Sequence, residues 1–78
     1  MQIICRHAYT DFNALEIAQG MENAGASVFS ITSINISERN TFEKEAYPFS
    51  FIVWARYDLP ITPKIIDCEI EKAMQIEG

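Results

Sequence analysis

The chain has 78 residues, which is enough for one domain spanning residues 1–78 and leaves no room for a second hydrophobic core. Its net charge is −5, and its longest apolar run, residues 51–55, is far shorter than the roughly 20 residues that cross a bilayer. Composition therefore argues against a membrane partner, and the acidic balance argues against a phosphate-binding protein, in which Lys and Arg gather on one surface.

The cysteine and histidine content argues against stabilisation of this small domain by disulfides or by a metal ion. A chain of this length buries only about 60% of the surface that its unfolded form exposes, so small domains often add disulfides, metals or self-association. Two cysteines, Cys5 and Cys68, make no disulfide framework, and His7 is the only histidine. We therefore predict no metal and no cofactor, and self-association remains. Residues 1–10 lack a long apolar region, so we expect a reducing, cytoplasmic location.

The negative charge belongs to two segments, residues 10–26 and 61–78, which are interpreted below as helices. They hold seven acidic residues and only two basic ones, Lys64 and Lys72, whereas the charges elsewhere balance. Because the remaining bases are scattered along the chain, we expect no direct nucleic-acid binding. The acidic residues are Asp11, Glu16, Glu22, Asp67, Glu69, Glu71 and Glu77.

The first two elements are predicted to be a strand over residues 1–7 and a helix over residues 10–26. The first is a short β-branched run. In the second, Thr10 or Asp11 can cap the helix, and Gly25 suits its end. Gly20 inside it costs about 1 kcal/mol of helix propensity. We expect one buried helix face, made of Ala14, Leu15, Ala18 and Met21.

Two more strands and a helix follow. Residues 27–37, rich in Val, Ile, Ser and Thr, favour a strand, and the charged residues 38–46 favour a hairpin tip. Residues 47–57 favour a third strand, with Pro48 near its end. In residues 61–78, Thr62 is the expected cap and Pro63 the first helical residue. Ile66, Ile70 and Ala73 mark the buried stripe of this helix, with Ile65 and Met74 beside it.

The order strand, helix, strand, strand, helix predicts an α+β fold. It is similar in topology to the ferredoxin-like plan without its last strand: a two-layer βαββα sandwich, with a three-stranded antiparallel sheet and both helices on one face. In this plan the third strand lies between the first two, and the missing strand leaves an open edge. Such folds carry many unrelated functions, so the topology indicates none.

Alternation along the third strand places apolar residues on both of its faces. The richer set, which we expect under the helices with Phe29 and Ile31 of the second strand, is Tyr47, Phe49, Phe51, Val53, Ala55 and Tyr57. If Ile3 and Cys5 also point inward, the helix-free face displays a large apolar patch, which marks an interaction surface. A β-bulge near Ser33 would instead turn Ile34 and Ile36 inward. Ile36 is expected on the helix-free face too, and the expected interaction residues are Ile4, Arg6, Ile34, Ile52, Trp54 and Arg56.

No residue pattern indicates catalysis. Cys5 and His7 lie two apart on a strand, about 6.5 Å between Cα atoms, and no third group orients the imidazole. Asp67, Glu69 and Glu71 lie off the apolar stripe of their helix. They form either a solvated face or an acidic surface that docks on a basic partner. Phe42 in the charged tip is either an ordinary tip residue or an anchor for a partner.

The sequence therefore predicts a non-enzymatic protein–protein interaction module. It would form a homodimer with Trp54 near the two-fold axis, or dock on a larger protein. Accessory and inhibitor proteins of mobile elements such as phages and plasmids are a class of this size and charge. The alternative is a small-ligand or nucleotide-binding regulator, with a site around Arg6, Arg56 and Trp54 where two protomers meet.

Overall fold

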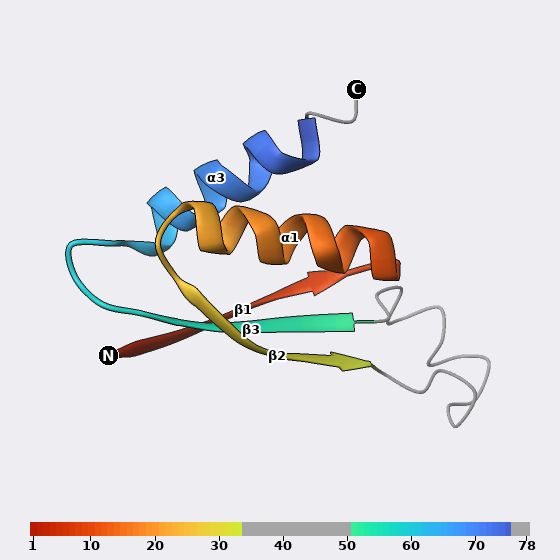
Figure 1. Cartoon of the computed structure of the whole chain (residues 1–78), viewed down its shortest axis with the longest axis horizontal. Helices are drawn as coiled ribbons and strands as arrows, with labels where there is room; N and C mark the ends of the chain where they lie inside the picture. Colours follow the sequence, from red (N-terminus) through yellow and green to blue (C-terminus); the bar gives the residue numbers. More distant parts are fainter. Residues whose placement is uncertain (34–50, 76–78) are drawn as a thin grey trace.

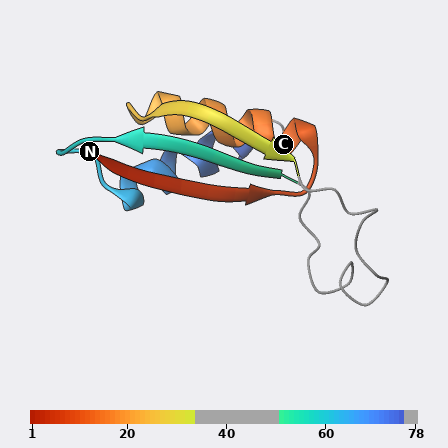
Figure 2. The same ribbon diagram turned by 90° about the horizontal axis from the view of Figure 1, so that it is seen from below.

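The computed structural model describes residues 1–33 and 51–75. These residues form an antiparallel three-stranded sheet with the strand order β1-β3-β2, and both helices lie on one side of it (Figures 1 and 2). The α+β fold expected from the sequence, the ferredoxin-like plan without its last strand, is confirmed. The elements are β1 (Gln2–Ala8), α1 (Asp11–Asn23), β2 (Ser27–Ser33), β3 (Phe51–Tyr57) and α3 (Pro63–Gln75).

Both helices begin at the caps expected from the sequence. The Thr10 hydroxyl accepts a hydrogen bond from the Asn13 backbone N–H at 3.0 Å, and the Thr62 hydroxyl accepts one from the Ile65 N–H at 3.3 Å. Each bond satisfies a backbone donor that the first turn of a helix leaves without a partner. After α1, Gly25 adopts a φ of 103°, a left-handed conformation in which glycine ends helices readily.

The buried face of α1 differs in part from the expected one. Ala14 and Met21 are buried, as predicted, but Leu15 is 63% exposed and Ile17 is buried in its place. Positions 14, 17 and 21 are three, four and seven residues apart and so share one face of a helix, whereas position 15 is rotated by about 100° from position 14. Leu15 was therefore assigned to the wrong face.

The two helices touch at Gly20. A Cβ atom built on this residue would lie 2.7 Å from the backbone nitrogen of Ile70 and 2.9 Å from the carbonyl oxygen of Glu69, closer than real Cβ contacts. The residue that weakens α1 as an isolated helix therefore lets the backbone of α3 pack directly against it. α3 packs chiefly against α1, and α1 contacts all three strands.

The residues of β1 that point toward the helices are not the expected ones. We call the side of the sheet that faces the helices its inner face. Ile4 pairs with Ala55 and Arg6 pairs with Val53, and Val53 and Ala55 are fully buried. Residues directly opposite each other on paired strands share a face, so Ile4 and Arg6 lie on the inner face, not on the helix-free face as predicted. Residues 3–5 are all apolar, so alternation alone does not show which of them point toward the helices. Pairing with β3 places Ile4 on the buried side.

A β-bulge in β2 changes the expected orientation of two more residues. Val28 pairs with Ala55 and Ser30 pairs with Trp54, so two residues of β2, Phe29 and Ser30, lie opposite one residue of β3. Val28 therefore faces the helices and packs against the core, and Phe29 does not, which reverses the prediction for this pair. The bulge lies at residues 28–30, ahead of the position expected near Ser33, which pairs regularly with Phe51.

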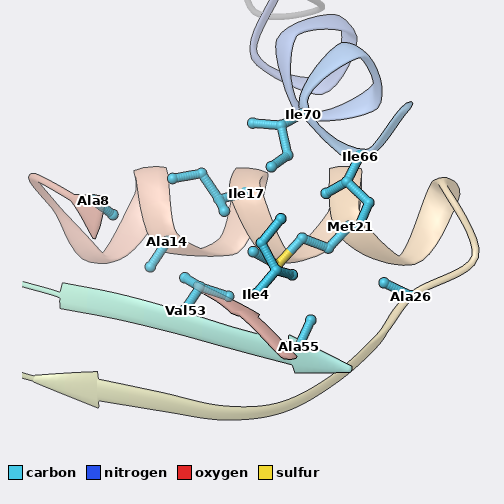
Figure 3. Close-up of a cluster of buried hydrophobic side chains, with 10 residues drawn as sticks. All are labelled: Ile4, Ala8, Ala14, Ile17, Met21, Ala26, Val53, Ala55, Ile66 and Ile70. Carbon is cyan, nitrogen blue, oxygen red and sulfur yellow. The ribbon is translucent and has the colours of Figure 1, made fainter. Parts of the chain in front are cut away.

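The core is a single cluster between the sheet and the helices (Figure 3). Met21 is central to it, at 0% exposure, with Ile66 and Ile70 on the α3 side and Val53 on the sheet side. On α3, Ile66 and Ile70 are buried as predicted, whereas the flanking Ile65 and Met74 are 44% and 40% exposed. The predicted hairpin tip 38–46, with Phe42, and the predicted strand residues 34–37 and 47–50 lie outside the described residues.

Candidate functional site: the helix-free face of the sheet

The candidate site is the outer face of the sheet, defined as the strand side chains that point away from the helices. Figure 2 shows this face in front, with both helices behind the strands. Pairing and alternation assign ten described residues to it, none of which carries a carboxylate. They are Ile3, Cys5 and His7 of β1, Ser27, Phe29, Ser30 and Thr32 of β2, and Ile52, Trp54 and Arg56 of β3.

Large apolar side chains are exposed on the outer face. Ile3 is 58% and Phe29 44% exposed, and Ile52 and Trp54 are half-buried. The predicted placement of Ile52, Trp54 and Arg56 on this face is confirmed. Burying a large apolar side chain stabilises a protein by roughly 1.5–3 kcal/mol. A partner that covered the outer face would gain this stabilisation from several side chains.

Trp54 is held in place within its own sheet. It occupies the central strand, between Cys5 of β1 and Ser30 of β2. Its indole Nε1–H donates a hydrogen bond to the Thr32 hydroxyl at 3.1 Å. With its one polar group satisfied, the ring offers a fixed apolar surface, and the entropy cost of ordering it in a contact is low.

Arg56 and Phe29 form the second feature of the outer face. The guanidinium carbon of Arg56 lies 4.6 Å from the centroid of the Phe29 ring, within the range of a cation–π contact. This contact places Phe29 on the same side of the sheet as Arg56. The bulge makes it possible, because it turns Phe29 to the outer face with Ser30.

Arg6, by contrast, takes part in an internal ion pair. Its Nε donates to Asp67 Oδ1 at 2.7 Å and its Nη2 to Asp67 Oδ2 at 2.8 Å, and Nη1 donates to the Cys5 carbonyl. These hydrogen bonds, more than the charge attraction, lower the pKa of Asp67 and raise that of Arg6. The two-pronged pair ties β1 to α3.

The structure does not assemble the ligand site expected around Arg6, Arg56 and Trp54. Arg6 lies on the inner face and the other two on the outer face, so one protomer cannot present both arginines to a single anion. The described part of the chain also contains no pocket. The alternative places the site where two protomers meet, which a single protomer does not test, so it stays a prediction.

The acidic residues of α3 are partly committed to neighbours within the chain. Asp67 binds Arg6, and Glu69 accepts a hydrogen bond from Lys72 Nζ at 3.2 Å. Glu71 is exposed. A basic partner would therefore compete with existing ion pairs at two of the three predicted positions, and the acidic-surface hypothesis stays a prediction.

Cys5 and His7 both lie on the outer face, and Cys5 is half-buried. Among residues 1–33 and 51–75, no group of three His, Cys, Asp or Glu side chains is arranged to hold a metal ion. The predicted absence of a catalytic dyad and of a metal site remains untested.

Sequence reasoning missed Ile3, Cys5 and Phe29 as outer-face residues. Ile3 and Cys5 were assigned to the opposite phase of β1. Phe29 was placed inside because strict alternation allows for no bulge. Ile34 and Ile36, also predicted for this face, lie outside the described residues.

Comparison of the chain with family models, with curated proteins and with solved structures finds no match. Neither helix in the described ranges has the length and apolar character needed to cross a membrane.

Proposed function

We propose that this chain is a non-enzymatic protein–protein interaction module and that the outer face of its sheet is the contact surface. One observation carries the proposal: Ile3, Phe29 and the half-buried Trp54 expose apolar surface on a face over which residues 1–33 and 51–75 place no helix. Contiguous apolar patches on a soluble domain mark interaction sites. Tryptophan and arginine are also the residues that dominate binding energy at protein interfaces.

The charge of the face suggests what it binds. Arg56 lies on it, and no carboxylate is found among its ten residues. A fitting partner surface is apolar at its centre and carries a carboxylate opposite Arg56. Desolvating Arg56 against an apolar surface alone would leave a buried charge without a partner.

Two partners offer an apolar centre, but the ten outer-face residues of a second copy supply no carboxylate for Arg56, which must then stay at the solvated rim of that contact. One is a second copy of the chain, packed face to face with Trp54 near the two-fold axis, and the other is a larger protein. A symmetric contact buries the same patch twice, which suits a domain with a small core. The second copy is the partner we expect first, because it needs nothing beyond the chain itself.

Replacing Trp54 with glutamate tests this proposal. Trp54→Glu puts a carboxylate at the centre of the face, and we expect the mass by light scattering to fall from dimer to monomer. Gln19→Glu adds the same charge at an exposed position of α1 and should change nothing. Far-UV circular dichroism checks that both variants fold.

A monomeric parent at tens of micromolar would rule out the face-to-face dimer. The proposal would then depend on a purified protein partner that the parent and Gln19→Glu bind and Trp54→Glu does not. If Trp54→Glu binds every partner of the parent with unchanged affinity, the outer face is not the contact surface.

A further inference from the structure

The two edges of the sheet differ in their suitability for pairing with another strand. β2 forms one edge and is interrupted by the bulge between Val28 and Ser30. β1 forms the other edge, and its seven residues pair with β3 in unbroken register from Gln2 to Ala8 (Figure 2). Bulges twist an edge and hinder pairing, whereas a regular edge strand offers a straight row of backbone N–H and C=O groups.

β1 also lacks the charged and proline residues that commonly protect an edge strand. It contains no proline, and Arg6 is its one permanently charged side chain. An inward-pointing charge normally discourages pairing because the added strand would bury it. Here Asp67 already neutralises Arg6 through two hydrogen bonds at 2.7 and 2.8 Å, so an added strand meets a paired charge.

We propose that β1 of a second copy pairs antiparallel with this edge and joins the two sheets into one continuous six-stranded sheet. Full overlap of two seven-residue strands about a two-fold axis places the axis at their middle residue, Cys5. Cys5 then lies opposite the partner's Cys5, and Ile4 lies opposite the partner's Arg6. Both strands gain backbone hydrogen bonds that neither edge makes alone.

Charge at this junction favours a second copy as the occupant. The pairing brings two Arg6–Asp67 ion pairs to the helix side of the axis, so positive and negative charges are equal in number there. Arg6 lies across from an aliphatic residue, and no two like charges lie directly opposite each other. The contact is therefore self-complementary, as a two-fold interface must be.

The edge contact leaves the outer face of each copy exposed, and it joins the two outer faces into one surface of twice the area. The outer-face residues of both copies would form one surface across six strands, with Trp54 of each copy on either side of the junction. This inference does not depend on the proposed function: the edge can pair even if the outer face binds nothing. Cys5 also lies on the outer face, so the two contacts are distinguished by the mixing experiment below: only the edge register places residue 5 directly opposite the partner's residue 5.

A charge exchange at residue 5 tests the edge pairing. Cys5→Lys places two lysines opposite each other at the axis and Cys5→Glu places two glutamates there. Each should weaken self-association by about fivefold or more, at the upper end of what opposed like charges on paired strands cost. Mixing the two variants pairs lysine with glutamate and should restore the parent dimer. Sedimentation velocity measures all three samples.

Gln19 provides the matched control, because it is exposed on α1 and belongs neither to the β1 edge nor to the outer face. Gln19→Lys, Gln19→Glu and their mixture should all associate like the parent. Where both contacts form, Trp54→Glu removes only the face-to-face contact, and the mass should fall to that of the edge dimer and not to that of the monomer.

Two results would overturn the inference. One is a parent that sediments as a monomer at all concentrations up to about tenfold above those used for the variants. The other is a mixture of Cys5→Lys and Cys5→Glu that associates no better than either variant alone.

A second experiment tests the register by oxidation with copper phenanthroline in a Cys68→Ser background. Directly opposed strand residues have Cα atoms about 4.5–5.5 Å apart, which is within disulfide range. A Cys5-linked dimer should therefore form rapidly. If the protein sediments as a dimer and this disulfide does not form, the proposed register is wrong.

Discussion

At the middle of β3, small side chains face the helices and large ones face away, while Phe51 and Tyr57 at the ends of the strand pack against the core on the helix side. Toward the helices the strand presents Val53 and Ala55, both fully buried, and on the other side it presents Ile52 and the largest side chain of the chain, Trp54. A sequence selected for the stability of the monomer alone would bury the tryptophan and expose the alanine. The small residues Val53 and Ala55 instead lie under α1, and Trp54 lies on the outer face that we propose as a contact surface.

The charges divide in the same way. Carboxylates are concentrated in the helices, whereas the outer face carries Arg56 and no carboxylate among the described residues. Among the described residues, the helix side is therefore the more acidic and the outer face the more basic. A partner approaching at low salt should be oriented by this difference before any apolar contact forms.

The largest expected difference is in the free energy of unfolding, between truncating a side chain in the core and truncating one on the outer face. Met21→Ala removes a fully buried side chain from the core and should lower the free energy of unfolding by about 2–5 kcal/mol. This is a large part of the stability of a 78-residue domain, at about 0.05–0.15 kcal/mol per residue. Ile3→Ala on the outer face should change it by less than about 0.5 kcal/mol.

Urea unfolding at a protein concentration below self-association measures both variants. A loss of more than about 2 kcal/mol for Ile3→Ala in the monomer would show that the outer face is covered within its own chain. The difference between the faces would then disappear.

An intermediate effect is expected at the contact between the helices. Gly20→Ala improves helix propensity by about 1 kcal/mol, but its Cβ would overlap backbone atoms of Ile70 and Glu69. Overpacking of this kind costs about 1–3 kcal/mol, and we expect it to dominate, because backbone atoms cannot move aside like the end of a flexible side chain. Thermal unfolding should show a lower melting temperature for Gly20→Ala.

Gln19→Ala is the matched control for Gly20→Ala, since it changes the neighbouring exposed residue of α1. It should leave the melting temperature nearly unchanged. A higher melting temperature for Gly20→Ala would mean that α3 does not pack against α1 at this distance.

The smallest effect should come from the ion pair that links β1 to α3. Binding to Arg6 lowers the pKa of Asp67 in the folded state, so the pair stabilises the fold above the unfolded-state pKa of about 3.9 and this contribution is lost as the pH falls through the lower folded-state value. The Asp67 side chain is 51% exposed, so solvent screens the pair and the contribution should stay below about 1 kcal/mol.

The measurement compares the free energy of unfolding of the parent and Asp67→Asn from pH 7 to pH 2. The difference should be present at pH 7 and close below pH 4. A difference of constant size across this range would show that Asp67 contributes through packing and not through its charge.

The sequence by itself determined where α3 begins, where α1 ends and, to within Thr10 or Asp11, where α1 begins, together with the inner face of the central strand. Thr10, Thr62 and Gly25 act through hydrogen bonds and backbone conformations that involve only neighbouring residues, so they can be recognised without the fold. The inner face of β3 was also predicted correctly, because the set in phase with Val53 and Ala55 is the more apolar of two apolar faces. Ile66 and Ile70 were found by helical spacing alone.

Only the tertiary structure decided the membership of the outer face. In β1, Ile3, Ile4 and Cys5 are all apolar, so alternation has no preferred phase until β3 pairs Ile4 with Ala55. In β2, the bulge moves Phe29 to the side of Arg56, and no residue type in that segment marks it. Gly20 counts against a helix in the sequence and becomes a requirement only when α3 packs against it. In each case the deciding contact joins residues far apart in the chain, and local patterns carry no information about such contacts.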